Sequence, residues 1–226
     1  MIFDKTNRNK VTRLPKRGAY DKATIYKILD AGFIAHVGFV VDGQPFVIPT
    51  AYGRDGDTLY IHGASTSRML VNLKEGIPVC LTVTHLDAIV LARSSYNHSM
   101  NYRSVVAFGK AKLVEGEEKE RALYVISENI LKGRWDEARE PNAKELKATS
   151  VLAIPIDSAS AKIRTGPPGD FKEDYELPIW AGNLPITTTY GTPEADEKNL
   201  EGLKVPKSAA DVAMKPFYQD SEKKDE

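Results

Sequence analysis

Three hydroxyl residues and an arginine follow a short strand-like apolar run. Residues 59–63 end at a glycine, and Ser65, Thr66, Ser67 and Arg68 then open a helical pattern. The first turn of a helix offers unpaired N–H groups and the positive end of the helix dipole. The hydroxyls and the guanidinium add donors and a full charge, so this combination predicts a phosphate site. In the alternative interpretation Ser65 only caps the helix and Arg68 is solvated.

Several other signatures of chemistry are missing from the sequence. It has no glycine-rich phosphate loop ending in lysine, no regular βαβ alternation with a glycine-rich first turn and no GxSxG nucleophile elbow. The acidic residues are scattered and give no catalytic pair. The histidines lack the spacing of a zinc site, so we predict no metal centre of that kind.

Four histidines are candidates for a role at the site. His62 ends the strand beside the predicted phosphate site, where an imidazole with an ordinary pKa near ~6.5 can orient a ligand or exchange a proton. The alternative is a hydrogen-bonded structural histidine. His36 lies within an apolar strand pattern and is expected to be structural, while His85 and His98 are expected in loops.

A polar loop at residues 93–103 separates two apolar strand patterns. Its donors, among them Ser99 and Asn101, suit a large heteroaromatic ligand with carbonyl and imide edges, and Arg103 is placed to reach a phosphate. The alternative is an ordinary surface loop, although long polar loops often carry function.

Pro49 interrupts a strand pattern and leaves backbone groups near Thr50 without a ladder partner. A flat ring can take those hydrogen bonds, or the position is only a sheet edge or a bulge. Trp180 follows a proline-rich and glycine-rich stretch. Its indole is suited either to stacking on a ring or to filling a dimer interface.

Composition limits the class of protein. The 226 residues carry 31 basic and 31 acidic side chains, a balance that argues against a general nucleic-acid binder. Cys80 is the single cysteine and lies in an apolar run, so we expect an inert buried thiol and a reducing, cytoplasmic location. We identify neither a signal peptide nor an apolar run long enough for a membrane span.

The order of the elements favours a sheet built from hairpins. Asp21 caps a short helix that ends by Gly32, and the Asp-Gly pairs at 42–43 and 55–56 predict two tight hairpins. The further expected elements are strands at 33–41, 44–52, 58–62, 77–84, 88–92, 101–113, 151–156 and 161–164, and a helix at 117–131.

We therefore predict a mainly β fold with α additions, closed into a barrel. Residues 1–20 form a basic N-terminal arm, residues 21–190 the barrel domain, and residues 191–226 a polar, charged tail. We expect the tail to be mobile or to pack late on the body or on a partner.

In this order, the segments resemble the FMN-binding split-barrel proteins, and more narrowly the pyridoxamine-phosphate-oxidase-like family that includes the nitroimidazole-resistance reductases. The resemblance covers roughly Arg13 to Pro185. Its most specific part is Ala92-Arg93-Ser94 with residues 98–105. The other matching segments are 42–50, 59–64 with Ser67 and Arg68, 133–135 and 180–182.

The resemblance implies a six-stranded antiparallel split barrel that forms a homodimer, with two FMN molecules in grooves between the subunits. FMN would supply the redox chemistry of an oxidoreductase with an unknown small substrate. The residues it assigns to the cofactor are Pro49, Thr50, His62, Ser67, Arg68, Ser99, Asn101, Arg103 and Trp180, and His62 would position a small acceptor as the catalytic candidate.

Alternatives to this assignment stay open. Met69 stands where vitamin B6 oxidases commonly carry a lysine after the phosphate arginine, which argues against oxidation of pyridoxamine phosphate. The alternatives to an enzyme are a flavin store, sensor or electron carrier, and a barrel that holds a deazaflavin or heme. Heme would need an axial ligand, which only the four histidines offer.

Overall fold

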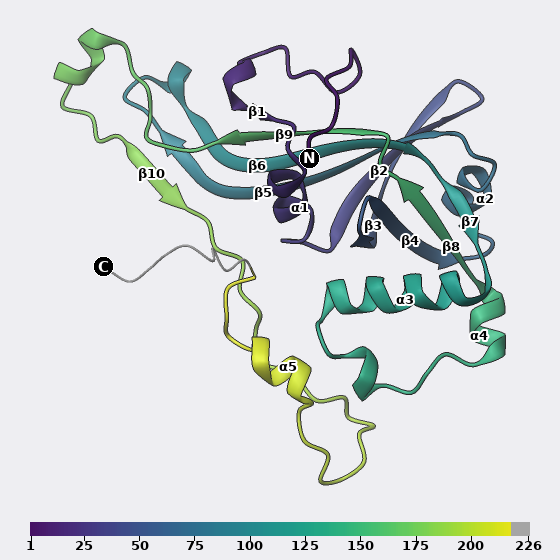
Figure 1. Cartoon of the computed structure of the whole chain (residues 1–226). Helices are drawn as coiled ribbons and strands as arrows, with labels where there is room; N and C mark the ends of the chain where they lie inside the picture. The colour runs from purple at the N-terminus through teal and green to yellow at the C-terminus, as the bar shows by residue number, and fades with distance from the viewer. Residues whose placement is uncertain (218–226) are drawn as a thin grey trace.

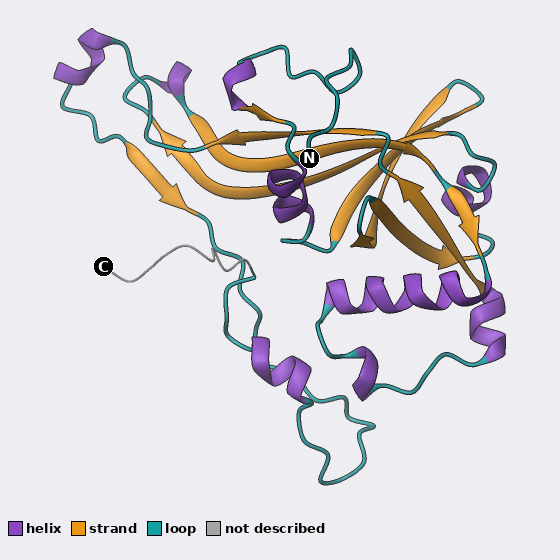
Figure 2. Ribbon diagram, viewed as in Figure 1, coloured by secondary structure: helices purple, strands orange, loops and turns teal. Residues whose placement is uncertain are grey.

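The computed structural model describes residues 1–217 of the chain. An extended, strongly curved sheet forms the body, and helices lie at its ends and along one side (Figures 1 and 2). The helices are α1 (Lys22–Leu29), α2 (Arg68–Leu73), α3 (Gly116–Ile130), α4 (Ala143–Ala148) and α5 (Lys207–Val212). Short 3₁₀ turns are η1 (Pro15–Arg17), η2 (Ser95–Asn97), η3 (Trp135–Glu137) and η4 (Lys172–Glu176).

The sheet contains ten strands within the described residues, all joined antiparallel, and not the six that the family resemblance implies. Their order is β1-β9-β6-β5-β2-β3-β4-β8-β7, and β10 pairs with β5 outside this path. The strands are β1 (Gly18–Ala19), β2 (Ile34–Val41), β3 (Gln44–Asp55), β4 (Thr58–Ala64), β5 (Pro78–Leu91), β6 (Ser99–Lys110), β7 (Lys112–Val114), β8 (Thr149–Pro155), β9 (Ser158–Arg164) and β10 (Gly182–Pro185).

Both predicted hairpins are confirmed. Asp42 and Gly43 join β2 to β3 with φ angles of 50° and 76°, the left-handed conformation that tight hairpin turns require. Gly56 joins β3 to β4 with a φ of 54°. The predicted cap is also confirmed, because the Asp21 carboxylate accepts a hydrogen bond from the Thr24 backbone N–H at 2.8 Å.

The sheet curls until its two ends meet. Strands β8 and β9 are consecutive in the chain but lie near opposite ends of the strand order. Asp157, in the short link between them, donates its backbone N–H to the Phe108 carbonyl at 2.9 Å. A Cβ at Gly109 would lie 2.2 Å from the Pro155 carbonyl oxygen, so glycine permits this close approach of β6 to β8. The result is a partly closed barrel.

The barrel interior is filled by aliphatic side chains from both halves of the sheet. Five of the fully buried side chains are Val37, Leu59, Leu81, Val105 and Leu152. Alternation of buried and exposed positions along β2 and β5 places Val37 and Leu81 on the inner face.

Strand β5 is one strand of 14 residues, where the sequence predicts two. A register shift between Leu86 and Ala88 in its pairing with β6 lets the ribbon bend without ending. The β5–β6 ribbon and β10 therefore extend beyond the barrel as an arm (Figure 1). The stretch 166–185, which is rich in proline and glycine, contains β10 because its backbone pairs with the free edge of β5.

Helix α3 packs on β3 and β4, with Ala122 and Ile126 buried. A Cβ at Gly53 would lie 2.7 Å from the Val125 carbonyl oxygen, so the helix lies directly on the strand. After α3 the chain makes an excursion, residues 131–148, that runs below the helix and returns through α4 to β8 (Figure 1).

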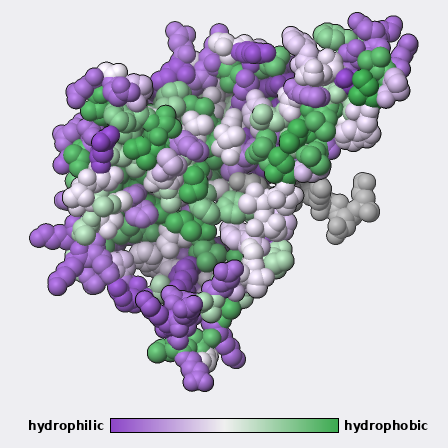
Figure 3. Space-filling view, turned by 180° about the vertical axis from the view of Figure 1, so that it is seen from behind, coloured by the Kyte–Doolittle hydropathy of each residue, from purple (hydrophilic) through white to green (hydrophobic). Residues whose placement is uncertain are grey.

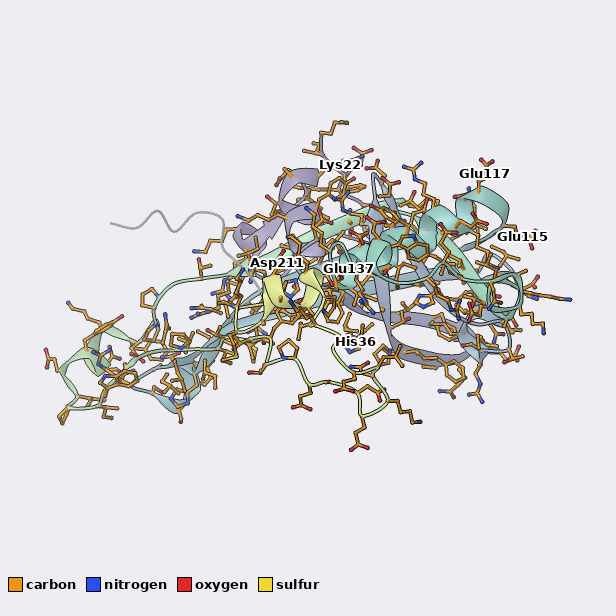
Figure 4. The ribbon with its side chains drawn as sticks, turned by 90° about the horizontal axis from the view of Figure 1, so that it is seen from below. Lys22, His36, Glu115, Glu117, Glu137 and Asp211 are labelled. Carbon is orange, nitrogen blue, oxygen red and sulfur yellow. The ribbon has the colours of Figure 1, made fainter. Side chains whose placement is uncertain are left out.

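Both terminal segments pack on the body. Asn9 is buried and donates to the Ala159 carbonyl at 3.0 Å, which places the N-terminal segment on β9. In the C-terminal segment Ser208 donates its backbone N–H to the Glu137 carboxylate at 3.1 Å. Figure 4 shows Glu137 beside Asp211 where α5 meets η3. Residues 218–226 of the predicted tail lie outside the described residues.

No helix among residues 1–217 combines the length and the apolar character needed to cross a bilayer.

Candidate functional site

The predicted phosphate donors lie at the start of α2. Ser67 is the N-cap residue, and its side chain makes no capping hydrogen bond. Arg68 is exposed, and its guanidinium lies 5.5 Å from the centre of the Phe46 ring. No carboxylate within residues 1–217 forms a salt bridge with Arg68. Because α2 has only six residues, the attraction for an anion rests on the Arg68 charge more than on the helix dipole.

Pro49 and Thr50 lie in the half of β3 that pairs with β2 on one side and with no strand on the other. Pro49 is opposite His36 of β2, whereas the pairing of β3 with β4 begins only at Tyr52. The residues of β3 before Tyr52 therefore present an open edge, which explains why a proline is tolerated there. Backbone groups at this edge are available to a ligand or a partner.

His62 lies on β4 at the edge of a cavity of about 430 Å³. Its Nδ1 is buried and has no hydrogen-bond partner among the described residues. Burial lowers the pKa of His62 below its ordinary value, so the imidazole is neutral at neutral pH. The other residues that line the cavity are Leu123, Ala138, Arg139, Pro141, Glu145, Leu146 and Thr149.

The other three histidines lie in different surroundings. His85 is buried, and its Nε2 lies 2.8 Å from the Ile28 carbonyl oxygen. His98 lies with its Nε2 3.2 Å from the Ala92 carbonyl oxygen. His36 is exposed on β2, so of the two structural positions that its apolar neighbours suggest, the core and an interface, the core is excluded.

The candidate residues of the polar loop lie on the arm or at its base. Asn101 is buried, accepts a hydrogen bond from Arg164 and donates to the Gly166 carbonyl at 3.0 Å. Arg103 binds the Asp87 carboxylate with Nε and Nη2, the latter at 2.7 Å. These two side chains already have structural roles.

Ser99 begins β6 opposite Val90, and Trp180, 69% exposed, precedes β10. Figure 1 places β10 and α2 toward opposite ends of the molecule. A single chain therefore brings Pro49 and Thr50 together on one strand but separates Ser67 and Arg68 from Trp180.

The sequence analysis missed a carboxylate that holds the arm. Asp170 accepts hydrogen bonds from the backbone N–H groups of Arg93 and Ser94 at 3.0 and 3.3 Å, and an ion pair from the Arg93 guanidinium at 3.2 Å. Burial alone would raise the pKa of Asp170, but these bonds lower it overall. Its only sequence signal is a lone aspartate after a Pro-Pro-Gly turn.

The sequence analysis also missed most of the cavity beside His62. Its outer wall comes from the excursion and α4. The local signal for α4 is a capping box, in which Asn142 and Glu145 each bind the other's backbone N–H.

Among the solved structures similar to this chain, the two described next span nearly its whole length. The flavocytochrome Anf3 from Azotobacter vinelandii is 40% identical, with 92% of this chain and 98% of that chain covered and a TM-score of 0.85. The FAD and heme binding protein from Mycobacterium smegmatis is 35% identical, with coverage of 90% and 100% and a TM-score of 0.86.

A more distant match is a putative 5-nitroimidazole antibiotic resistance protein from Bacteroides thetaiotaomicron. It is 25% identical, covers 65% of this chain and 86% of its own, and has a TM-score of 0.54. A search of curated proteins gives no match.

The family model described as pyridoxamine 5'-phosphate oxidase matches residues 21–163, which is more than half of the chain. This range includes the two hairpins, the start of α2 and the polar loop on which the resemblance rests. The chain belongs to the pyridoxamine 5'-phosphate oxidase family.

Proposed function

We propose that this protein is a flavin-dependent oxidoreductase that works as a homodimer, with each flavin bound between two subunits. The observation that carries the proposal is the similarity, over nine-tenths of the chain, to two solved flavoproteins of 40% and 35% identity. The donors at the start of α2 fit a flavin phosphate, because Arg68 has no carboxylate partner in the described chain and Ser67 makes no cap bond.

The identity of the flavin is part of the proposal. The family resemblance implies FMN, whereas the protein from M. smegmatis binds FAD. Both carry the phosphate that Arg68 and Ser67 would hold. The adenine nucleotide of FAD would need additional room, so the released cofactor decides between them.

The dimer is supported by an uncovered apolar surface. The outer face of β2 and β3 carries Ile34, Val40 and Val47, which are 47%, 55% and 67% exposed, together with His36 and Pro49. An antiparallel sheet face in contact with water is normally polar. Hydrophobic side chains also gather in patches on the face of the molecule seen from behind (Figure 3). A second copy would cover the outer face of β2 and β3.

A dimer would also complete the site. In one chain Ser67 and Arg68 are separated from Trp180, so no single subunit offers all the candidate residues to one flavin. In a symmetric dimer the arm of one subunit can contact the barrel of its partner. Ser99 and Trp180 would then approach the ring or ribityl chain from the second subunit, while Asn101 and Arg103 would hold the arm through Arg164 and Asp87.

A bound flavin supplies the two-electron chemistry, and the protein supplies binding and electrostatics. Arg68 and Ser67 would hold the phosphate, and the open edge of β3 near Thr50 would orient the ring. His62, neutral at neutral pH, would position a small acceptor. No protein nucleophile is required. A cytoplasmic location and the absence of nucleic-acid partners stay predictions.

The test is the absorption spectrum of the purified protein, followed by chromatography of the cofactor released by heat. We expect visible flavin bands and release of FMN or FAD. A flavin that is bleached by NADH or NADPH under anaerobic conditions would support an enzyme over a store or carrier. A colourless protein that binds neither flavin when each is added would contradict the proposal.

The second candidate function is a flavocytochrome, which holds heme as well as flavin. It is favoured by the two similar structures that span the chain, one a flavocytochrome and the other a FAD and heme binding protein. A deazaflavin has no comparable support.

A further inference from the structure

Two arginines lie close together where the N-terminal segment meets the base of the arm. Strand β1 pairs with β9 so that Gly18 is opposite Lys162. Arg17, which precedes Gly18, is therefore brought beside the end of β9, where Arg164 is the last residue of the strand. Burial lowers the pKa of the Arg164 guanidinium, and the charge of Arg17 lowers it further. We call Arg17 and Arg164 the arginine pair.

The arginine pair lacks an anion that would compensate its charge. Arg164 is 8% exposed, and its guanidinium donates to the Asn101 side chain and, at 3.5 Å, to the Pro167 carbonyl. Both acceptors are neutral. Neither arginine forms a salt bridge with a carboxylate within residues 1–217. Buried charges are normally paired, and a second cation nearby adds repulsion.

The sheet around the arginine pair adds a third cation and no opposite charge. Ala161 is buried in the core and Ile163 packs against it, so Lys162 and Arg164, which alternate with them, lie on the outer face of β9. The residues that follow across this face on β6 and β5 are all neutral: Tyr102, Ser104, Leu86 and Thr84. The excess of positive charge at this place is therefore not balanced by the neighbouring strands.

The donors of this cluster fit a phosphate group. A guanidinium carries five N–H donors, and Arg164 uses two of its nitrogens for Asn101 and Pro167. Arg17 and Lys162 are half-buried, so the cluster is accessible from their side. Guanidinium groups bind phosphate oxygens in pairs of parallel hydrogen bonds. Three cations around one place suit a group with more than one negative charge better than a single carboxylate.

This cluster is separate from the predicted phosphate site at Arg68. Strand β9 ends at the base of the arm, whereas α2 lies toward the other end of the molecule (Figure 1). One chain therefore carries two places at which an uncompensated arginine is available to an anion.

We propose that Arg17 and Arg164, together with Lys162, form a second phosphate-binding site, which holds a phosphate or diphosphate group. The group belongs either to the diphosphate of FAD or to a separate phosphorylated ligand. The inference goes beyond the proposed function, because the site does not depend on the binding of a flavin phosphate at Arg68.

Isothermal titration calorimetry with inorganic pyrophosphate, at physiological ionic strength, tests the site in the full chain loaded with FMN. We expect one pyrophosphate per chain in wild type. Arg17→Gln should weaken its binding at least tenfold, because one of the two guanidinium groups is lost. Lys162→Gln should weaken it by a smaller factor. Lys10→Gln is the matched control, since it removes an exposed charge of the same N-terminal segment, and it should bind as wild type does.

Titrations of the apoprotein with FMN and with FAD identify the source of the phosphate. If the diphosphate of FAD fills the site, Arg17→Gln weakens FAD binding at least tenfold and leaves FMN binding unchanged, and FAD-loaded wild type no longer binds pyrophosphate. If a separate ligand fills the site, Arg17→Gln binds both flavins as wild type does, and FAD-loaded protein still binds pyrophosphate. Either result supports the second site.

FMN-loaded wild type that binds no pyrophosphate, or Arg17→Gln that binds it as tightly as wild type, would overturn the inference. A changed oligomeric state of Arg17→Gln with unchanged pyrophosphate binding would assign the arginine pair to a carboxylate of the partner subunit and would also overturn it. If the protein binds neither flavin, the same titration is made on the apoprotein. Pyrophosphate binding that depends on Arg17 would then leave this inference standing while the proposed function fails.

Discussion

Arg68 stands out among the charged residues near the candidate site because it is exposed and makes its recorded contact with a ring, Phe46, and not with a carboxylate. An exposed guanidinium without a carboxylate partner, at the start of a helix, is well placed to bind a phosphate. Arg103, by contrast, is held by Asp87.

Replacing Arg68 with alanine should weaken flavin affinity at least tenfold, because a charge-assisted phosphate contact contributes about 1.5–3 kcal/mol. A fluorescence titration of apoprotein with FMN and with FAD measures the change. Lys74→Ala, at the opposite end of α2, is the matched control and should bind as wild type does. An unchanged dissociation constant in Arg68→Ala would contradict the phosphate assignment.

His85 makes stability depend on pH. Burial lowers the pKa of His85 below its ordinary 6.5, and the charge of Arg103 lowers it further. The Ile28 carbonyl and Asp87 raise the pKa, but their effects are smaller than the total lowering. The unfolded chain therefore binds a proton more readily than the native protein. Stability is full above the unfolded pKa and falls as the pH drops below it.

We therefore expect the urea midpoint of the protein to fall as the pH is lowered below about 6.5, and the fall to be smaller in His85→Gln. Urea unfolding followed by fluorescence at several pH values checks this. Equal pH dependence in wild type and variant would show that His85 does not control it.

The residue types at the candidate site could be predicted from the sequence, but the partners to which their side chains are hydrogen-bonded could not. Ser67 and Arg68 lie where a helix start was expected. Asn101 is a buried hydrogen-bond partner of Arg164. The contact forms because the register between β6 and β9 places Tyr102, the neighbour of Asn101, opposite Arg164. Pairing register depends on long-range contacts that local patterns do not contain.

At the scale of elements, turn chemistry was the reliable guide. Asp42 and Gly43 set the first hairpin and Gly56 sets the second, since left-handed φ angles are accessible to these residues. Elements that depend on a distant partner were missed: β10 forms only against β5, and β5 runs through a bulge where two strands were expected. Helix α4 is short, and its capping box is a local signal that went unused.

Gly109 tests the closure of the barrel. An alanine there would place its Cβ 2.2 Å from the Pro155 carbonyl oxygen, so β6 and β8 must separate. We expect Gly109→Ala to destabilise the protein by about 1–3 kcal/mol, as for other overpacked sites. Thermal or urea unfolding measures this, with Gly169→Ala as control because a Cβ there meets nothing within 4 Å. Equal stability of the two variants would mean that the barrel is not closed at this point.

At the scale of the whole molecule, the barrel and the arm carry different parts of the candidate site, and the outer face of β2 and β3 carries exposed apolar residues. The family could be identified from the ordered set of segments. The arrangement of two subunits could not, because sequence patterns show that a strand face is apolar but not what covers it.

Val47→Asp tests the dimer surface directly. Burying an unpaired carboxylate is costly, and a two-fold interface would bury it twice, so we expect the dimer dissociation constant to rise at least tenfold. Analytical ultracentrifugation measures it. Leu113→Asp, on β7, is the control for an exposed apolar residue outside this face. A Val47→Asp protein with the oligomeric state of wild type would place the interface elsewhere.

The most direct test of a flavin bound between subunits uses mixed dimers. Arg68→Glu and Trp180→Glu subunits carry different affinity tags, and dimers containing one of each are isolated. If each site takes Arg68 from one subunit and Trp180 from the other, one site in the mixed dimer carries both changes and the other carries neither. The account predicts that either variant alone binds little flavin, whereas the mixed dimer recovers half of the wild-type content. A mixed dimer with no more flavin than its parents would show that each site lies within one chain and would contradict the account.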